Sequence, residues 1–187
     1  MASRYALLLI DFFNPLGFED LASPRATLLA ARNAARLMVR LRRARVPVIY
    51  ANDNFGQWAS EFSMLVAACR KHSGVPAAIA ELLAPQPGDC SILKPRHSAF
   101  FGTPLDFLLD EMKARTLILT GVSADSCVMF TAHDGYLRKF RLWVPQDCVA
   151  SRTPAYTRAA LTHVARVLHA STARSTGKVP TLASARG

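Results

Sequence analysis

The sequence has few cysteines, and none of the four lies close to another. Zinc sites and redox pairs usually have two cysteines a few residues apart, so the spacing argues against a zinc site, a redox pair and a disulfide framework. Free thiols persist in a reducing cytoplasm, and we expect a cytoplasmic protein in which one thiol is available for chemistry. The four candidates are Cys69, Cys90, Cys127 and Cys148.

Long apolar runs, internal repeats and linker-like segments are missing as well. No stretch is apolar for long enough to cross a bilayer, and the first residues pass through a charge directly to Asp11, unlike a signal peptide. A chain of 187 residues, 51% of them hydrophobic, can bury one core. We expect a single domain over residues 1–170, no membrane contact, and a tail over residues 171–187 that is flexible or contacts another subunit.

Acidic residues are scarce, since 13 Asp and Glu oppose 23 Lys and Arg and give a net charge of +10. Such an excess would suit nucleic acid or another anionic partner. Four arginines, however, recur at helical spacing opposite small and apolar residues, which is typical of the solvent-facing side of an amphipathic helix. They are Arg32, Arg36, Arg40 and Arg43. Because the sequence also lacks a nucleic-acid motif, we predict no nucleic-acid partner.

Short apolar runs alternate with longer stretches of helical periodicity. The short runs predict strands at residues 5–10, 46–50, 91–93, 116–120 and 142–144, and the longer stretches predict helices at residues 24–45, 60–72, 104–113, 126–139 and 154–169. Ser23, Thr103 and Thr153, each followed by proline, are predicted to cap three helices. Strands that alternate with helices form parallel sheets through right-handed crossovers. The sequence therefore predicts an α/β protein with one three-layer α/β/α domain and a mostly parallel, Rossmann-like central sheet.

Asp11, Lys94 and Cys127 each follow a different predicted strand. Ligands of open parallel sheets bind beyond the carboxyl ends of the strands, so these three side chains are expected to converge. Cys127 lies near the start of a predicted helix, where free amides, together with Lys94, would lower its thiol pKa. Asp11 could take the thiol proton and return it to a departing amine, while amides of the turn receive the oxyanion.

Each of these residues also has a structural alternative. A buried cysteine more often packs than reacts, an aspartate at a strand end often caps a turn, and a lone lysine is usually solvated. Packing is the interpretation for Cys69, Cys90 and Cys148. The joint placement of the other three residues favours chemistry.

Four segments carry a resemblance that runs nearly the whole length of the chain. They are LLLID at residues 7–11, LKPRHSAFFGT at 93–103, GVSADSCV at 121–128 and VPQDCVAS at 144–151. Through them the chain resembles the isochorismatase-like cysteine hydrolases, a family that includes nicotinamidases, carbamoylsarcosine amidases and ureidoacrylate amidohydrolases.

The resemblance implies a catalytic triad of Asp11, Lys94 and Cys127. It also implies a cis peptide between Val122 and Ser123, and an oxyanion hole formed by the amides of Ser123 and Cys127. Cys127 would attack a carbonyl carbon, ammonia or an amine would leave, and water would release the acid. Related hydrolases form dimers or tetramers, so a homo-oligomer is expected.

Two departures from family patterns are informative. Nicotinamidases have metal-binding Asp and His residues after the second strand, whereas here Asp53 is followed by Phe55 at the position of the histidine. One carboxylate cannot hold a zinc or iron ion, so we predict no metal and no other cofactor. True isochorismatases cleave a vinyl ether and lack the nucleophilic cysteine, which this chain has.

Seven residues near the expected site could enclose a small substrate, although core packing is the commoner role for aromatic side chains. They are Phe13, Asn54, Trp58, His97, Phe100, Phe101 and Phe130. We predict a metal-independent cysteine amidohydrolase that cleaves a small amide, ureido or carbamoyl C–N bond through a thioester. Two alternatives stay open: attack of the same thiol on an ester or another non-amide electrophile, and a catalytically silent scaffold that binds an anion.

Overall fold

A computed structural model describes residues 4–177, which form six strands and six helices. All strands pair in parallel in the order β3-β2-β1-β4-β5, with β6 beside β4, so the predicted fold class is confirmed. Within this range no helix is both long and apolar enough to cross a membrane. The strands are β1 (Tyr5–Ile10), β2 (Val48–Asp53), β3 (Cys90–Lys94), β4 (Thr116–Val122), β5 (Arg141–Trp143) and β6 (Val149–Ala150). The helices are α1 (Pro24–Arg43), α2 (Phe62–Lys71), α3 (Val75–Leu82), α4 (Leu105–Glu111), α5 (Cys127–Leu137) and α6 (Pro154–Val167).

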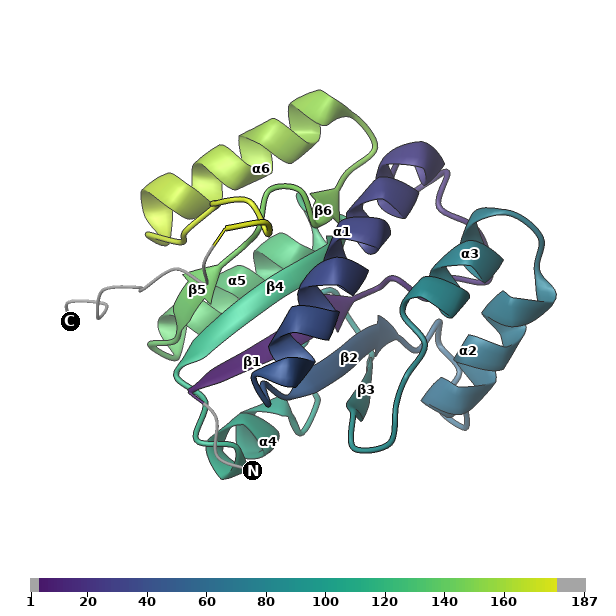
Figure 1. The fold of residues 1–187 in the computed structure, drawn as a ribbon, viewed down its shortest axis with the longest axis horizontal. Helices are drawn as coiled ribbons and strands as arrows, with labels where there is room; N and C mark the ends of the chain where they lie inside the picture. Colours follow the sequence, from purple (N-terminus) through teal and green to yellow (C-terminus); the bar gives the residue numbers. More distant parts are fainter. Residues whose placement is uncertain (1–3, 178–187) are drawn as a thin grey trace.

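The side chains of β1 alternate between two hydrophobic clusters because successive residues of a strand point to opposite faces. Leu7 and Leu9 belong to the cluster that includes α1, α2 and α3, whereas Ala6, Leu8 and Ile10 belong to the cluster that includes α4, α5 and α6. Figure 1 shows α1 crossing one face of the sheet while α5 lies behind β4. Both faces of the central strands are covered, which explains why their sequences are continuous apolar runs.

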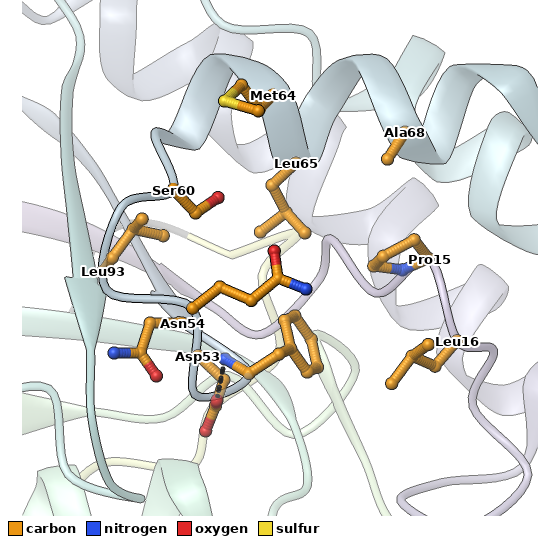
Figure 2. A pocket seen from close by; sticks show the side chains of 11 residues that line it. Pro15, Leu16, Asp53, Asn54, Ser60, Met64, Leu65, Ala68 and Leu93 are labelled. Atoms are coloured by element: carbon orange, nitrogen blue, oxygen red, sulfur yellow. Dashed lines mark hydrogen bonds between the residues drawn. The ribbon is translucent and has the colours of Figure 1, made fainter.

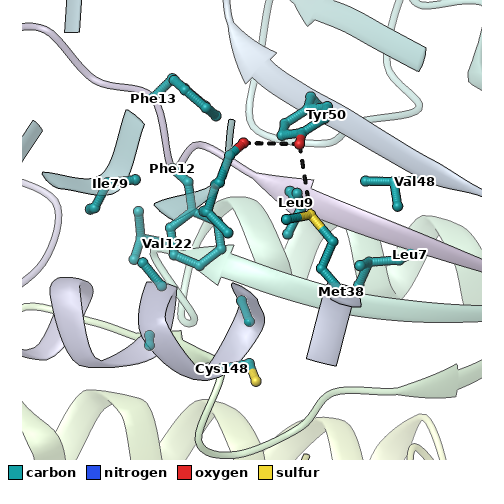
Figure 3. Close-up of a cluster of buried hydrophobic side chains, with 14 of the residues drawn as sticks. Leu7, Leu9, Phe12, Phe13, Met38, Val48, Tyr50, Ile79, Val122 and Cys148 are labelled. Carbon is teal, nitrogen blue, oxygen red and sulfur yellow. Dashed lines mark hydrogen bonds between the residues drawn. The ribbon is translucent and has the colours of Figure 1, made fainter. Parts of the chain in front are cut away.

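The first cluster is arranged around Tyr50, a fully buried residue of β2 (Figure 3). The Tyr50 hydroxyl donates to the Leu83 carbonyl at 2.9 Å and lies 3.7 Å from the Met38 sulfur. Its ring contacts Phe13 and Phe62, with centroid distances of 5.8 and 5.2 Å. A buried tyrosine hydroxyl needs a polar partner, so this hydrogen bond holds the end of α3 against β2.

Most of the predicted elements are found, and the differences have physical causes. β2 continues to Asp53, beyond the end of the predicted strand. The prediction stops early because Asn52 and Asp53 are polar and lie beyond the apolar run that defines it. α3 and β6 have no predicted counterpart, since eight and two residues are too few to show a clear hydrophobic period. Ser23 precedes α1 but its hydroxyl makes no capping bond, contrary to the prediction, whereas Thr153 accepts from the Tyr156 amide at 3.2 Å.

Residues 171–177, part of the predicted tail, pack against the domain. The amide and the hydroxyl of Ser175 each donate to the Asp147 carboxylate at 2.8 Å, and the Arg40 guanidinium donates to the Ser175 carbonyl at 2.6 Å. These bonds hold the described part of the predicted tail against α1 and the loop before β6. The rest of the predicted tail, residues 178–187, lies outside the described residues.

β1 and β4 approach each other closely at the end of the sheet where Asp11 follows β1. Gly121 of β4 pairs with Ile10 of β1 and has a φ of 131°, a conformation that glycine adopts without steric conflict. A Cβ atom on Gly121 would lie 2.0 Å from the Ile10 carbonyl oxygen. This position therefore requires glycine.

We expect Gly121→Ala to lower the free energy of unfolding by about 3 kcal/mol or more, because the added methyl group overlaps the main chain and the φ is strained for alanine. Denaturant unfolding followed by circular dichroism measures the change. Gly177→Ala is the matched control, since a Cβ there meets nothing closer than 3.7 Å, and its effect should stay within about 0.5 kcal/mol. Equal stability of the two variants would contradict the close approach.

Candidate active site

The sheet brings Asp11, Lys94 and Cys127 together at the edge formed by the carboxyl ends of its strands. Asp11 follows β1, Lys94 is the last residue of β3, and Cys127 is the first residue of α5, which follows β4. The strand order places β2 on one side of β1 and β4 on the other, so β1 and β4 flank the topological switch point. Ligands of open parallel sheets bind at such points.

Lys94 lies at the centre of this group. Its Nζ atom is 2.8 Å from Asp11 Oδ2 and 3.7 Å from Cys127 Sγ. The Asp11 carboxylate is close enough to the Cys127 thiol to influence its ionisation. The Lys94 side chain has no exposed surface, and Asp11 and Cys127 are only 5% and 6% exposed, so salt screens this ion pair little.

A second carboxylate residue, Asp53, fixes the position of Asp11. The Asp53 amide donates to Asp11 Oδ1 at 2.7 Å, and the Asp53 carboxylate lies 3.8 Å from Lys94 Nζ. Asp11 itself has a φ of 50°, in the left-handed region that aspartate enters more readily than most residues. Sequence reasoning misses this role of Asp53 because the predicted strand ends at Tyr50. The register of β2 and β3, which pairs Asp53 with Lys94, reveals it.

The ionisation of the Cys127 thiol differs from the prediction. Burial and the neighbouring Asp11 carboxylate raise its pKa from 9.0 to about 12, although Lys94 acts in the opposite direction. The predicted lowering of this pKa is therefore wrong, because the loss of solvation outweighs the favourable charge of Lys94. At neutral pH the thiol keeps its proton, which must be removed as the sulfur attacks.

The two charged partners of the thiol also have shifted pKa values. Burial raises the pKa of Asp11 above its ordinary 3.8, although Lys94 acts against this shift. Burial alone would lower the pKa of Lys94, but the Asp11 carboxylate and, once it is ionised, the Cys127 thiolate raise it above 10.5. Lys94 therefore stays charged over the whole neutral range, and Asp11 becomes a better proton acceptor than an ordinary carboxylate.

The turn from Val122 to Cys127 positions the nucleophile. The peptide bond between Val122 and Ser123 is cis. The amides of Ser126 and Val128 donate to the Ser123 carbonyl at 3.1 and 3.2 Å, which closes the turn at the start of α5. Within residues 4–177 the amides of Ser123 and Cys127 have no acceptor, so both can donate to an oxyanion.

His97 and Phe130 lie on the solvent side of the thiol. His97 Nδ1 is 3.7 Å from Cys127 Sγ and 3.4 Å from Ser126 Oγ. The imidazole stacks on the Phe130 ring with a centroid distance of 5.3 Å, and both side chains are exposed. Of the seven candidate pocket residues, His97 is the one for which a contact with the sulfur is seen, and Phe130 packs on its ring.

A cavity of about 300 Å³ lies beside the ion pair, between α2 and the loop after β2 (Figure 2). Figure 2 shows Asp53 and Asn54 on one side of this cavity and Met64 and Leu65 of α2 on another. Asn54 is the candidate pocket residue that lines it, and the thiol is not part of the lining. Within the described residues, the cavity therefore meets the site only through Asp53, which faces Lys94.

The remaining four candidates divide into exposed and core residues. Trp58 and Phe101 are 80% and 60% exposed. Phe13 packs against the rings of Tyr50 and Phe62 in the first cluster, as described above. Phe100 is buried against Phe140, with the Arg138 guanidinium over its ring. The structure therefore places Phe13 and Phe100 in the core, which is the commoner role for such side chains.

The residues after β2 do not fit a metal site. Asp53 Oδ1 accepts from the Phe55 amide at 2.6 Å, and Oδ2 faces the Lys94 ammonium. Phe55 has no atom that can coordinate a metal. Across residues 4–177, no group of three or more His, Cys, Asp or Glu side chains is arranged to hold a metal ion.

Comparison with known proteins agrees with this geometry. The profile of the Isochorismatase domain matches residues 5–175. The isochorismatase family protein YaaI of Bacillus subtilis (strain 168) is 34% identical over 168 residues, which make up 88% of this chain and 91% of that protein.

Two further relatives carry the names of amide hydrolases. A segment of 63 residues, 34% of this chain, is 44% identical to 25% of the ureidoacrylate amidohydrolase RutB of Methylorubrum extorquens. The crystal structure of N-carbamoylsarcosine amidase from Thermoplasma acidophilum is similar with a TM-score of 0.72 and 26% identity, over 95% of this chain and 100% of that chain.

We expect Lys94→Met to lower the free energy of unfolding at neutral pH by about 3–5 kcal/mol, because it leaves the buried Asp11 carboxylate without a counter-charge. Adding Asp11→Asn should recover part of the loss, since neither charge then remains. Lys71→Met, at an exposed lysine, is the control and should change stability by less than about 0.5 kcal/mol. Denaturant titrations compare the four proteins, and a stable Lys94→Met variant would disprove the dependence on the ion pair.

Proposed function

The chain belongs to the isochorismatase family, and on that premise we propose that it is a cysteine amidohydrolase that cleaves a small amide, ureido or carbamoyl C–N bond through a thioester at Cys127. Its amide-hydrolysing relatives, ureidoacrylate amidohydrolase and N-carbamoylsarcosine amidase, support a hydrolase of C–N bonds other than peptide bonds. One observation carries the finer proposal: the buried sulfur of Cys127 lies 3.7 Å from Lys94 Nζ, which is itself paired with Asp11 at 2.8 Å, and Asp11 acts on the ionisation of the thiol. A sulfur that only packed in the core would not need both partners.

The geometry supports a two-stage reaction. As Sγ of Cys127 bonds to the carbonyl carbon, Asp11 takes the thiol proton, and the amides of Ser123 and Cys127 stabilise the negative oxygen. Asp11 then gives this proton to the nitrogen as the C–N bond breaks, which leaves a thioester. Water attacks the thioester with Asp11 again as base, and the acid leaves as the proton returns to the sulfur. Lys94 holds the carboxylate in place and stabilises the thiolate whenever it forms.

Different observations support the type of bond that is cleaved and a mechanism without a metal ion. Ureidoacrylate amidohydrolase and N-carbamoylsarcosine amidase favour an amide, ureido or carbamoyl group. The metal-independent form rests on Phe55, which cannot be a ligand, and on Asp53, whose carboxylate is engaged by Lys94 and an amide. An ester would meet the same thiol, so esters belong in the assay.

We expect Cys127→Ala and Cys127→Ser to lower hydrolysis by at least about a thousandfold while the fold is kept, since no other group near the carbonyl can form the thioester. Acid release from a panel of small amides, ureido acids, carbamoyl compounds and esters measures activity, and circular dichroism checks folding. Cys90→Ser, at a partly exposed thiol of β3, is the control that should stay active. Turnover by Cys127→Ala would refute the nucleophile, and turnover of esters alone would refute the bond type.

The pKa shifts of Asp11 and Cys127 predict the pH dependence of the route in which Asp11 accepts the thiol proton. Because the pKa of Asp11 is raised above 3.8, lowering the pH through it protonates the carboxylate and removes the acceptor for the thiol proton. We expect kcat/KM to fall on the acid side with an apparent pKa above 3.8, and to show no break near 9, because the pKa of Cys127 is about 12. A pH–rate profile tests both limbs, with circular dichroism excluding acid unfolding. A break near pH 9 would show that the thiol titrates like an ordinary cysteine.

A further inference from the structure

His97 is an exposed imidazole that contacts the nucleophile. Its Nδ1 atom lies 3.7 Å from Cys127 Sγ, the same separation as between this sulfur and Lys94 Nζ. Lys94 and Asp11 are buried, whereas His97 is open to solvent. The sulfur is therefore flanked by the ion pair on its buried side and by an imidazole on its solvent side.

The loop that carries His97 is attached to the helix that carries the nucleophile. The Ala99 amide donates to Thr131 Oγ1 at 3.0 Å, and the Ser98 hydroxyl donates to the Asp134 carboxylate. Thr131 and Asp134 both belong to α5, whose first residue is the nucleophile. These bonds fix the imidazole relative to the sulfur, and the stacking on Phe130 orients its ring.

Asp11 and His97 are the two possible acceptors for the thiol proton, and they differ in the polar partners that they already have. The Asp11 oxygens face Lys94 Nζ at 2.8 Å and the Asp53 amide at 2.7 Å. Within residues 4–177 the polar neighbours of His97 Nδ1 are the thiol and the Ser126 hydroxyl. In the tautomer that carries its proton on Nε2, Nδ1 offers a lone pair to the thiol. Imidazole is also the side chain best suited to accept protons near neutral pH.

We propose that His97 is a second catalytic base for Cys127, which takes the thiol proton from the solvent side. The role deepens the proposed function and rests on it, because it serves the same nucleophile. Nδ1 accepts the proton while Sγ forms its bond to the carbonyl carbon and the carbonyl electron pair moves to oxygen. The imidazolium then gives the proton to the leaving nitrogen as the C–N bond breaks, and the imidazole is neutral again. Along this path Asp11 stays ionised and paired with Lys94 until water attacks the thioester.

Alkylation of Cys127 by iodoacetamide tests the base without a substrate. In this reaction the sulfur bonds to carbon, iodide leaves and the thiol proton must be accepted by a base. We expect His97→Ala and His97→Phe each to slow the alkylation by about tenfold or more at neutral pH, as measured by peptide mass spectrometry. His97→Phe keeps a ring that can stack on Phe130, so it removes the base while keeping the packing. Arg96→Gln, an exposed neighbour, is the control and should react like the wild type.

Added imidazole shows whether His97 acts as a base or only positions the nucleophile. Because the side chain of residue 97 is open to solvent, free imidazole can enter the space left by His97→Ala and should restore its rate in proportion to the concentration of neutral imidazole. The phenyl ring of His97→Phe fills this space, so that variant should not recover. Wild-type alkylation rates in His97→Phe, or equal acceleration of all proteins by imidazole, would overturn the proposal. His97-dependent alkylation combined with no turnover on the amide panel would leave the base in place and refute the proposed reaction.

Discussion

A lysine ammonium without solvent contact is stable only beside an anion. At Lys94 this requirement accounts for the positions of the acidic residues in the site. Removing the ammonium from water is expensive, and the Asp11 carboxylate at 2.8 Å compensates for it. The Asp53 carboxylate stands 3.8 Å away and its amide holds Asp11. Asp11 follows β1, Asp53 ends β2 and Lys94 ends β3, so the ion pair and its neighbour connect the ends of three adjacent strands. The electrostatic requirement of one side chain thereby links the ends of β1, β2 and β3.

The same burial determines the state of the sulfur. In a solvent-exposed site Lys94 would favour the thiolate, but here the loss of solvation raises the pKa of Cys127 to about 12. The nucleophile therefore rests as a neutral thiol. Its reactivity depends on groups that remove the proton during attack. The bases around the sulfur therefore matter more for its reactivity than the positive charge of Lys94 does before the substrate reacts.

Sequence reasoning predicts which side chains meet where this follows from the order of the strands, and it fails where a property depends on packing depth. Asp11, Lys94 and Cys127 can be identified because each follows an apolar strand, and parallel strands bring such residues to one edge. The direction of the thiol pKa cannot be predicted in this way, because it depends on how much water the surrounding side chains exclude.

The aromatic candidates show the same limit. Phe13 and Phe130 are the same residue type near the same site, yet the first packs in the core and the second stacks on His97. The sequence does not distinguish them because both are aromatic residues, and only the packing shows that Phe13 is buried whereas Phe130 is exposed. The pKa values of all four cysteines are raised, with burial as the main cause. Peroxide oxidises thiolates much faster than thiols, so this chain, although its cysteines are all free, should resist oxidative inactivation better than enzymes that keep a standing thiolate.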